Sequence, residues 1–308
     1  MINPLIGHPK ILLIGSLGQL GFELSRSLAP VGALITLTRS DLDLMQTQSV
    51  IDVLDLYAPN FIVNAAAYTQ VDQAESDQIL AYAINSDVPK ILARWAAAHQ
   101  SCLVHYSTDY VFDGQKSSAY CENDLAYPLS VYGNSKLQGE INIRHELEAH
   151  FIFRTSWLYG AYGNNFLKTM LHLMQTQREL RVVNDQVGTP TSTRLLADIT
   201  AYIVRNSWLK RQNGLTIPYG TYHLTANGET SWYGYAQLIA QQAIALGWQL
   251  KMAPHQINPV LSSEYPSLAN RPKNSRLNTQ LLRETFGLEL PNWQDEVKFA
   301  LQMLKDAH

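Results

Sequence analysis

The segment Ile11-Leu12-Leu13-Ile14-Gly15-Ser16-Leu17-Gly18-Gln19-Leu20-Gly21-Phe22-Glu23-Leu24 decides the fold of this 308-residue chain. It opens with a continuous apolar run, which is typical of a strand buried on both faces of a parallel sheet. Three glycines follow in the spacing G-x-x-G-x-x-G, and then a helix begins. In this context the glycines permit a tight turn, a close backbone approach to a pyrophosphate and close packing of helix on strand. Because free N–H groups at a helix N-terminus favour an anion, the segment predicts dinucleotide binding.

The rest of the first half repeats the alternation of apolar runs and amphipathic stretches. Further buried strands are expected at 33–37, 61–63 and 102–104, and the runs at 151–153 and 180–183 extend the series. Helical periodicity covers roughly 19–29, 47–57, 85–99 and 132–147. This order predicts right-handed βαβ units and an α/β fold with a Rossmann-like, doubly wound parallel sheet.

The character of the sequence changes beyond about residue 208. The stretches 211–230 and 251–275 are rich in Pro, Gly, Asn and Ser, and helical patterns lie at 231–246, 278–286 and 292–305. We expect a dinucleotide-binding domain of residues 1–158 plus about 192–212, and a smaller α/β substrate lobe of about 159–191 and 213–308. A crevice between two such lobes is a natural ligand site, with 231–233 and 270–272 as candidate nucleotide contacts.

Composition excludes several classes of function. The chain has a formal net charge of −3, 16% charged and 46% hydrophobic residues, so it is too apolar for disorder and too neutral to bind a nucleic-acid backbone. Two cysteines, Cys102 and Cys121, form no disulfide framework, which favours a reducing compartment. No apolar stretch approaches the roughly 18 residues of a membrane span. Residues 1–4 lack the cationic start of a secretory signal, so we expect a cytoplasmic enzyme.

Residues that follow the second and third strands concern the cofactor. Arg39 comes directly after the second strand, where a guanidinium suits the 2′-phosphate of NADP, although a solvated loop arginine explains it nearly as well. Asp41 and Asp43 stand close by, so both nicotinamide cofactors remain possible, and we expect NADPH with NADH as the alternative. The third strand runs into Asn64-Ala65-Ala66-Ala67-Tyr68, whose small residues leave room for a ligand against the backbone or for close helix packing.

Tyr132 and Lys136 are the candidate catalytic pair. They are four residues apart at the start of a predicted helix, and so share one helix face. A nearby ammonium favours the phenolate and lowers the tyrosine pKa, as a general acid requires. Thr108, at the end of the fourth strand, offers a hydroxyl for the carbonyl oxygen being protonated. A Y-x-x-x-K motif alone is no evidence for catalysis, because it occurs by chance. This one is evidence because it follows the fourth strand of a predicted nucleotide-binding domain.

Together these features resemble the extended short-chain dehydrogenase/reductase family, and connecting segments resemble the dTDP-4-dehydrorhamnose reductases within it. The segments lie in the family's order between residues 11 and about 200, with a looser match to the end of the chain. They are Ser107-Thr108-Asp109-Tyr110-Val111-Phe112-Asp113-Gly114, Pro128-Leu129-Ser130-Val131-Tyr132-Gly133, Arg154-Thr155-Ser156-Trp157-Leu158-Tyr159-Gly160, Asn164-Asn165-Phe166 and Val183-Asn184-Asp185-Gln186-Val187-Gly188-Thr189-Pro190-Thr191.

The resemblance implies an oxidoreductase that reduces the 4-keto group of dTDP-4-dehydro-L-rhamnose with NADPH or NADH, the last step of dTDP-rhamnose biosynthesis. Tyr132 would protonate the alkoxide, Lys136 would hold the nicotinamide ribose, and Thr108 would bind the ketone oxygen. The positions that match cofactor contacts are Gly15, Gly18, Gln19, Leu20, Gly21, Asp43, Leu44, Ala66, Ala67, Tyr68 and Tyr106. Positions that match substrate contacts are Thr108, Asp109, Tyr110, Trp157 and Asn165.

The chain departs from the family at a metal site. Some members form a magnesium-bridged dimer through glutamates on three segments, and only Glu23 matches, because Arg194 and Gln294 occupy the other two positions. Magnesium needs oxygen ligands, which an arginine cannot supply. We therefore expect no metal, and a monomer or weak homodimer with a dTDP-sugar as its small-molecule partner.

Two alternative functions stay open at this point. A nucleotide-sugar epimerase or dehydratase shares the glycine loop and the Tyr–Lys pair, and a dehydratase needs the acidic residue that Asp109 supplies. The adjoining Tyr110 and the Val111-Phe112 continuation fit the reductases better. A non-catalytic NADP-binding regulatory subunit is the second alternative, and the presence of Tyr132, Lys136 and Thr108 argues against it.

Overall fold

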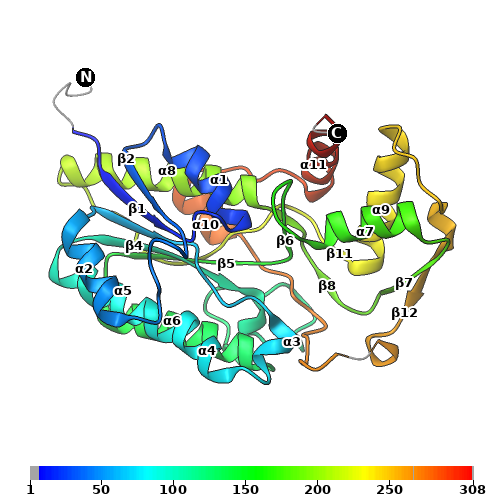
Figure 1. The fold of residues 1–308 in the computed structure, drawn as a ribbon, viewed down its shortest axis with the longest axis horizontal. Helices are drawn as coiled ribbons and strands as arrows, with labels where there is room; N and C mark the ends of the chain where they lie inside the picture. Colours follow the sequence, from blue (N-terminus) through cyan, green and yellow to red (C-terminus); the bar gives the residue numbers. More distant parts are fainter. Residues whose placement is uncertain (1–6, 266, 307–308) are drawn as a thin grey trace.

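The computed structural model describes residues 7–265 and 267–306, so the N-terminal residues 1–4 considered above lie outside the described part of the chain. Its centre is a six-stranded parallel sheet in the order β10-β5-β4-β3-β1-β2 (Figure 1). These strands are β1 (Lys10–Ile14), β2 (Ala33–Leu37), β3 (Phe61–Asn64), β4 (Cys102–Thr108), β5 (His150–Thr155) and β10 (Gly220–His223). The sheet confirms the Rossmann-like prediction.

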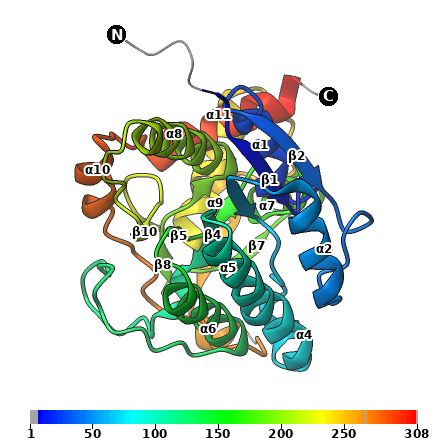
Figure 2. The same cartoon turned by 90° about the vertical axis from the view of Figure 1, so that its left-hand side faces the viewer.

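Helices cover both faces of the sheet because both faces are apolar (Figure 2). Along β1, Ile11 and Leu13 face one hydrophobic cluster and Leu12 and Ile14 face another. One face carries α1 (Gln19–Leu28) and α8 (Thr193–Gln212), which pack on each other. The opposite face carries α2 (Thr47–Tyr57), α5 (Val88–Ala98) and α6 (Val131–Glu146), preceded by the short elements α3 (Val71–Ala74), α4 (Gln78–Tyr82) and the π-helical turn η1 (Ala83–Asp87).

A second group of elements extends from one end of the sheet, at the right of Figure 1. It contains the helices α7 (Phe166–Thr176), α9 (Trp232–Ala245) and α11 (Trp293–Asp306). Two small sheets accompany them, β7 (Leu180–Val183) with β12 (Ile257–Val260) and β8 (Val187–Gly188) with β11 (Thr230–Ser231). The remaining elements are β6 (Leu158–Tyr159), β9 (Thr191–Ser192), α10 (Gln280–Phe286) and the 3₁₀ turns η2 (Asp109–Val111), η3 (Pro254–Gln256) and η4 (Ser262–Glu264).

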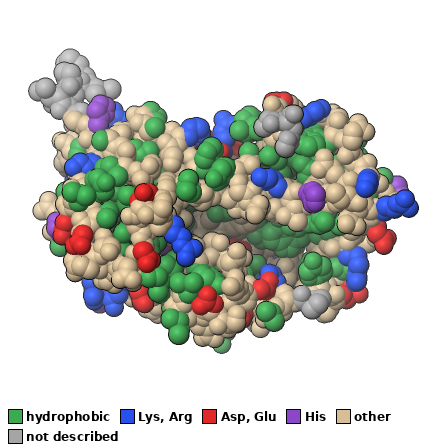
Figure 3. Space-filling view, in the orientation of Figure 1, with side chains coloured by type: hydrophobic (Ala, Val, Ile, Leu, Met, Phe, Trp, Pro, Cys, Tyr) green, Lys and Arg blue, Asp and Glu red, His purple; other side chains and the backbone are tan. Residues whose placement is uncertain are grey.

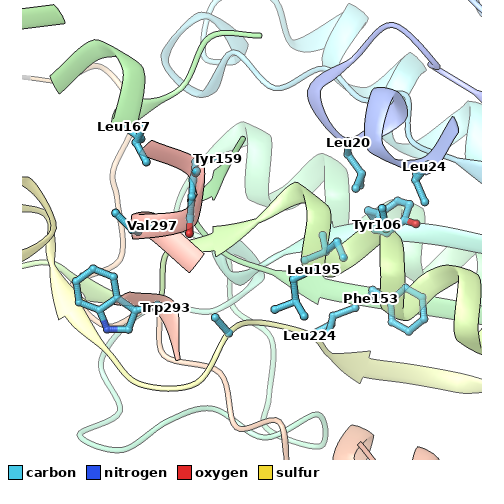
Figure 4. Packing of buried hydrophobic residues seen from close by; sticks show 14 of the residues in the cluster. Leu20, Leu24, Tyr106, Phe153, Tyr159, Leu167, Leu195, Leu224, Trp293 and Val297 are labelled. Atoms are coloured by element: carbon cyan, nitrogen blue, oxygen red, sulfur yellow. The ribbon is translucent and has the colours of Figure 1, made fainter. Parts of the chain in front are cut away.

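The two groups share one hydrophobic core (Figure 4). Leu20, Leu24 and Phe153 come from the sheet and its helix, whereas Leu167 and Trp293 come from the second group, and all belong to the same buried cluster. No helix in the described part of the chain is long and apolar enough to cross a membrane.

Two features of the sheet differ from the sequence expectation. Residues 180–183 do form a strand, but it pairs with β12 and does not extend the main sheet. The sixth strand is instead Gly220–His223, which carries no continuous apolar run and which the expected division had placed in the substrate lobe. Pairing with β5 through the backbone explains how such a short, partly polar segment becomes an edge strand.

Candidate active site

The glycine loop lies where the strand order reverses, between β1 and β3. Gly15 has φ +83°, and a Cβ there would lie 2.8 Å from the backbone nitrogen of Ala66, in the loop after β3. A Cβ on Gly21 would lie 2.0 Å from the carbonyl oxygen of Gly15. Both positions therefore require glycine, as the sequence predicts. Ligands of open α/β sheets bind at such a switch point, beyond the carboxyl ends of the strands.

The N-terminus of α1 is open to an anion. Its capping residue is Gly18, which has no side chain to bind the N–H groups of the first turn. Helix N–H groups that lack a cap, together with the helix dipole, bind a phosphate. Gln19 begins the helix, and its Oε1 accepts a hydrogen bond from Asn165 Nδ2 at 3.0 Å. Asn165 is the N-cap residue of α7, so this bond ties the glycine loop to the second group of elements.

The loop after β2 leaves a cation exposed. Asp41 is committed to Thr38, accepting from its backbone N–H at 2.8 Å and from its hydroxyl at 2.6 Å. Asp43 accepts from the N–H of Met45 at 3.0 Å. Arg39 is exposed, and within the described residues no carboxylate pairs with it. The guanidinium is therefore available to a ligand phosphate.

Helix α6 brings Tyr132 and Lys136 to the carboxyl end of β4. Ser130 caps it by accepting from the N–H of Gly133 at 3.1 Å. Lys136 is 2% exposed, and its ammonium donates to the carbonyl oxygen of Tyr106 at 2.6 Å. Burial lowers the pKa of Lys136 to about 8, against a smaller opposing effect of Glu140. The lysine thus remains largely protonated at neutral pH and readily releases its proton just above it.

Tyr132, Thr108 and Asp109 form a connected set of polar groups. Burial raises the pKa of Tyr132 to about 12, while a side-chain hydrogen bond with Thr108 lowers it. The lowering by Lys136 that the sequence led us to expect is not among these effects, and Tyr132 is a protonated donor at neutral pH. The Thr108 hydroxyl donates to Asp109 Oδ1 at 2.9 Å. Burial raises the pKa of Asp109 to about 6, although side-chain hydrogen bonds with Ser275 and Thr108 lower it. Among the described residues, no hydrogen bond within 3.5 Å reaches its Oδ2.

Asn85 supports this site and was missed by sequence reasoning. It lies in the π-helical turn η1, a rare distortion that is frequent at functional sites. Its side chain accepts from the N–H of Tyr68 at 2.9 Å and donates to the carbonyl oxygen of the same residue at 3.0 Å. It also donates to Ser135 Oγ at 3.0 Å, and Ser135 bonds the carbonyl oxygen of Tyr132. A break in the helical period of 83–87 is the signal that could have located it.

A cleft of about 580 Å³ lies between α7, β7 and residues 262–265 and 267–273, and Figure 3 shows the molecule hollowed right of its centre. Its lining combines aromatic rings with three cations, Arg181, Arg271 and Lys273. Trp232 lines the cleft and stacks on Trp157, with ring centroids 3.6 Å apart. Arg271 also bonds Asp72 of α3 at 2.6 Å, which links this segment to the sheet domain. The candidate contacts 231–233 and 270–272 thus meet in one cleft through Trp232 and Arg271.

The other predicted site residues differ in their surroundings. Tyr110 lies beside Tyr132, with ring centroids 6.0 Å apart. Trp157 has φ +48°, and such backbone strain clusters at functional sites. The side chain of Tyr106 points away from Lys136, into the core under α8, where its hydroxyl bonds Thr200 at 2.8 Å. The side chain of Leu20 is buried in one hydrophobic cluster, and that of Leu44 is partly buried against another.

At two of the three positions discussed for a metal, the side chains make other contacts. Glu23 pairs with Arg26 at 3.0 Å, and Arg194 lies over the ring of Phe299 at 4.2 Å and near Asp198 at 3.7 Å. Within residues 7–265 and 267–306, no group of three His, Cys, Asp or Glu side chains is arranged to hold a metal ion.

Comparisons with known proteins agree on one family. The family described as "RmlD substrate binding domain" matches residues 9–306. The chain is 43% identical to a dTDP-4-dehydrorhamnose reductase of Shigella flexneri over 96% of this chain and 98% of that protein. It is 41% identical to one of Burkholderia thailandensis, over 96% and 99%. A crystal structure of the Bacillus anthracis reductase in complex with NADP is 34% identical, with a TM-score of 0.86 over 96% of this chain and 99% of that one.

Proposed function

The chain belongs to the dTDP-4-dehydrorhamnose reductase family, and from this premise we propose which of its residues perform the reaction. The enzyme reduces the 4-keto group of dTDP-4-dehydro-L-rhamnose to dTDP-L-rhamnose, the reduction step of dTDP-rhamnose biosynthesis, and uses NADPH. The observation that carries the residue roles is the set of Tyr132, Lys136 and Thr108 at the carboxyl ends of the strands, next to the open N-terminus of α1.

The residues of the glycine loop fit a dinucleotide. A Cβ at Gly15 or Gly21 would collide with neighbouring backbone atoms, so glycine is what permits the close packing of this loop. The uncapped first turn of α1 would bind the pyrophosphate. Asp43 and Leu44 would border the adenosine, and Ala66, Ala67 and Tyr68 would form the wall beside the nicotinamide half. Bound NADPH supplies the hydride.

The catalytic residues then manage the proton. Tyr132 would donate to the ketone oxygen, and so would Thr108 once its hydroxyl, which now donates to Asp109, turns to the substrate. Both donors would stabilise the negative charge that develops on that oxygen. Tyr132 gives its proton to that oxygen, because its raised pKa keeps it protonated beforehand. The buried ammonium of Lys136 stabilises the resulting phenolate and would bind the nicotinamide ribose. Asp109 Oδ2 has no hydrogen bond within 3.5 Å among the described residues and would accept one from a sugar hydroxyl.

The cleft beside α7 suits the nucleotide part of the substrate. Arg181, Arg271 and Lys273 each lie within 4.0 Å of a carboxylate, and they would contact a diphosphate by exchanging those partners for it. Trp232 provides a ring face for a base or a deoxysugar. Trp157 stacks on Trp232 and would extend this surface toward Tyr132. The monomer or weak homodimer and the cytoplasmic location expected from the sequence remain predictions.

Turnover tests the activity directly. Purified enzyme is mixed with NADPH and enzymatically generated dTDP-4-dehydro-L-rhamnose, and cofactor absorbance is followed. We expect continuous oxidation of one NADPH per dTDP-L-rhamnose formed. An epimerase or dehydratase would convert the sugar without net NADPH oxidation, and a regulatory subunit would bind NADPH without turnover. Either result would overturn the reductase assignment.

Arg39 tests the cofactor preference. Because its guanidinium is exposed and free of carboxylates in the described chain, the Arg39→Asp variant should bind NADPH more weakly relative to NADH. We expect the ratio of kcat/KM for the two cofactors to shift toward NADH by roughly tenfold or more, as loss of a charge-assisted phosphate contact predicts. The Arg94→Asp variant, on α5, is a matched control. An unchanged ratio in Arg39→Asp would remove this residue from the 2′-phosphate site.

A further inference from the structure

His105 is a buried polar residue for which the fold has no evident need. It lies in the middle of β4, follows the apolar residues Leu103 and Val104, and is 1% exposed. Because side chains alternate along a strand, His105 and Leu103 lie on the same face of the sheet. Leu103 packs there against apolar residues of α5 and of the C-terminal half of α6. An imidazole at such a place costs folding free energy unless both ring nitrogens find partners.

One ring nitrogen of His105 faces the candidate catalytic lysine, since Nε2 lies 3.3 Å from Lys136 Nζ. Nδ1 lies 3.2 Å from Asn64 Nδ2, at the end of β3, and Asn64 Oδ1 accepts from the N–H of Ala66 at 3.2 Å. Asn64 Nδ2 and the Lys136 ammonium are both donors, whereas a neutral imidazole has a single acceptor nitrogen. Nε2 therefore accepts from Lys136, and Nδ1 carries the ring proton and gains no hydrogen bond from Asn64.

The surroundings of Lys136 leave few other groups to hold it. Its ammonium has the Tyr106 carbonyl at 2.6 Å and the His105 ring, and no carboxylate forms an ion pair with it in the described residues. Glu140, one turn along α6, is held by Arg154 at 2.7 Å and by Arg144 at 2.9 Å. Burial keeps the His105 ring neutral, since its pKa lies well below the ordinary value. A lysine side chain has four rotatable bonds, so two fixed partners define where its charge sits.

We propose that His105 is a positioning residue for Lys136, fixing the ammonium between β4 and α6 where it reaches both Tyr132 and the cofactor ribose. The inference rests on the proposed function of Lys136. It gives strand β4 a part in the reaction through His105. His105 touches neither the substrate nor the cofactor in this account and acts through Lys136 alone.

Three substitutions at one position separate this role from a packing role. In His105→Asn the shorter side chain loses the reach to Lys136. In His105→Gln the side chain reaches about as far as Nε2 and offers a donor or an acceptor, so it replaces the ring in either tautomer. His105→Met fills the volume at the same reach without a strong hydrogen-bonding group. His150→Asn is the matched control, because His150 is also buried but bonds the Leu147 carbonyl oxygen at the opposite end of the sheet.

Activity is compared with NADPH affinity, measured by fluorescence quenching without substrate. We expect His105→Asn and His105→Met to lose about ten- to a hundredfold in kcat and to bind NADPH more weakly, because small displacements of a catalytic group have effects of that size. His105→Gln should stay within about threefold of the wild type, and His150→Asn should keep its kcat and NADPH affinity. If His105→Asn does not fold, His105→Met carries the test.

A double-mutant cycle gives the decisive readout. In a Lys136→Met background, His105→Asn should change kcat by less than about twofold, because a residue that acts through Lys136 has no effect once the lysine is gone. An equal loss of kcat in both backgrounds, or native kcat in His105→Asn, would overturn the proposal. Failure of the proposed function is distinguishable, because the wild type would then show no turnover while the NADPH affinities could still be compared.

Discussion

Helices α5 and α6 lie side by side on the same face of the sheet but bury opposite kinds of residue (Figure 2). Helix α5 turns Val88, Leu92 and Trp95 toward the strands, and each is at most 6% exposed. Helix α6 buries Lys136 and Glu140 on its inner side, with exposed fractions of 2% and 0%. Two neighbouring helices that pack on the same face of the sheet therefore do so with different residues, apolar ones in α5 and charged ones in α6.

The difference marks the part of the molecule that is kept for catalysis. An apolar inner face stabilises the fold, whereas burying an ammonium or a carboxylate costs free energy that only fixed partners offset. Glu140 has such partners in Arg154 and Arg144. Lys136 has a carbonyl oxygen and an imidazole instead of a carboxylate, and its pKa is lowered accordingly. Natural proteins violate packing rules of this kind mainly at functional sites.

The largest expected effect is the loss of activity when the buried lysine of α6 is removed. Lys136→Met should lower kcat by about 10²–10⁴-fold, the usual size of a general acid–base contribution, because the phenolate of Tyr132 loses its stabilising charge. The matched control is Lys90→Met on α5, where the lysine is only partly buried and should be dispensable. Equal kcat values for the two variants in steady-state assays would show that the buried lysine of α6 is no more important for catalysis than the lysine of α5.

The next effect concerns stability and falls on α5. Leu92 is fully buried, so Leu92→Ala should lower the free energy of unfolding by about 2–5 kcal/mol through lost burial and the cavity left behind. The folded variant should retain its kcat, because Leu92 contacts neither the glycine loop nor Tyr132. Urea unfolding and steady-state kinetics measure both quantities. A strong loss of kcat in folded Leu92→Ala would show that α5 also shapes the site.

The smallest effect is the pH dependence of stability that Lys136 imposes. Its folded pKa of about 8 lies below the unfolded value of 10.5, so between these pH values the unfolded state binds more protons. In this window Lys136 should make stability rise with pH by up to about 1.4 kcal/mol per unit, the slope for one proton. The difference in unfolding free energy between wild type and Lys136→Met, measured from pH 7.5 to 10, isolates this slope. A constant difference would mean that the lysine is not desolvated.

Much of the fold was predictable from the sequence because local signals and burial agree there. The run Ile11-Leu12-Leu13-Ile14 and its counterparts became β1 to β5, and the helical periodicity at 85–99 located α5. The edge strand Gly220–His223 escaped prediction because backbone pairing with β5, a long-range contact, creates it. Residues 180–183 have a strand sequence, but their partner is Ile257–Val260, and no local pattern reveals which strand a segment pairs with.

The site divides in the same way. Gly15, Gly21 and the Tyr132–Lys136 pair were predictable because their spacing within one segment carries the chemistry. The contacts of Lys136 with His105, and of Asn85 with Tyr68, join residues 31 and 17 positions apart, and only the folded chain reveals them. For the same reason the raised pKa of Tyr132 was not foreseen, since burial depends on elements that arrive from elsewhere in the sequence.

The central claim is that the buried polar face of α6 delivers the proton for ketone reduction, and Tyr132→Phe tests it most directly. Rapid mixing of enzyme saturated with NADPH and dTDP-4-dehydro-L-rhamnose gives the rate of a single turnover, and fluorescence quenching gives the NADPH affinity. We expect a single-turnover rate about 10²–10⁴-fold below that of the wild type, with NADPH affinity unchanged. A single-turnover rate close to that of the wild type would contradict it.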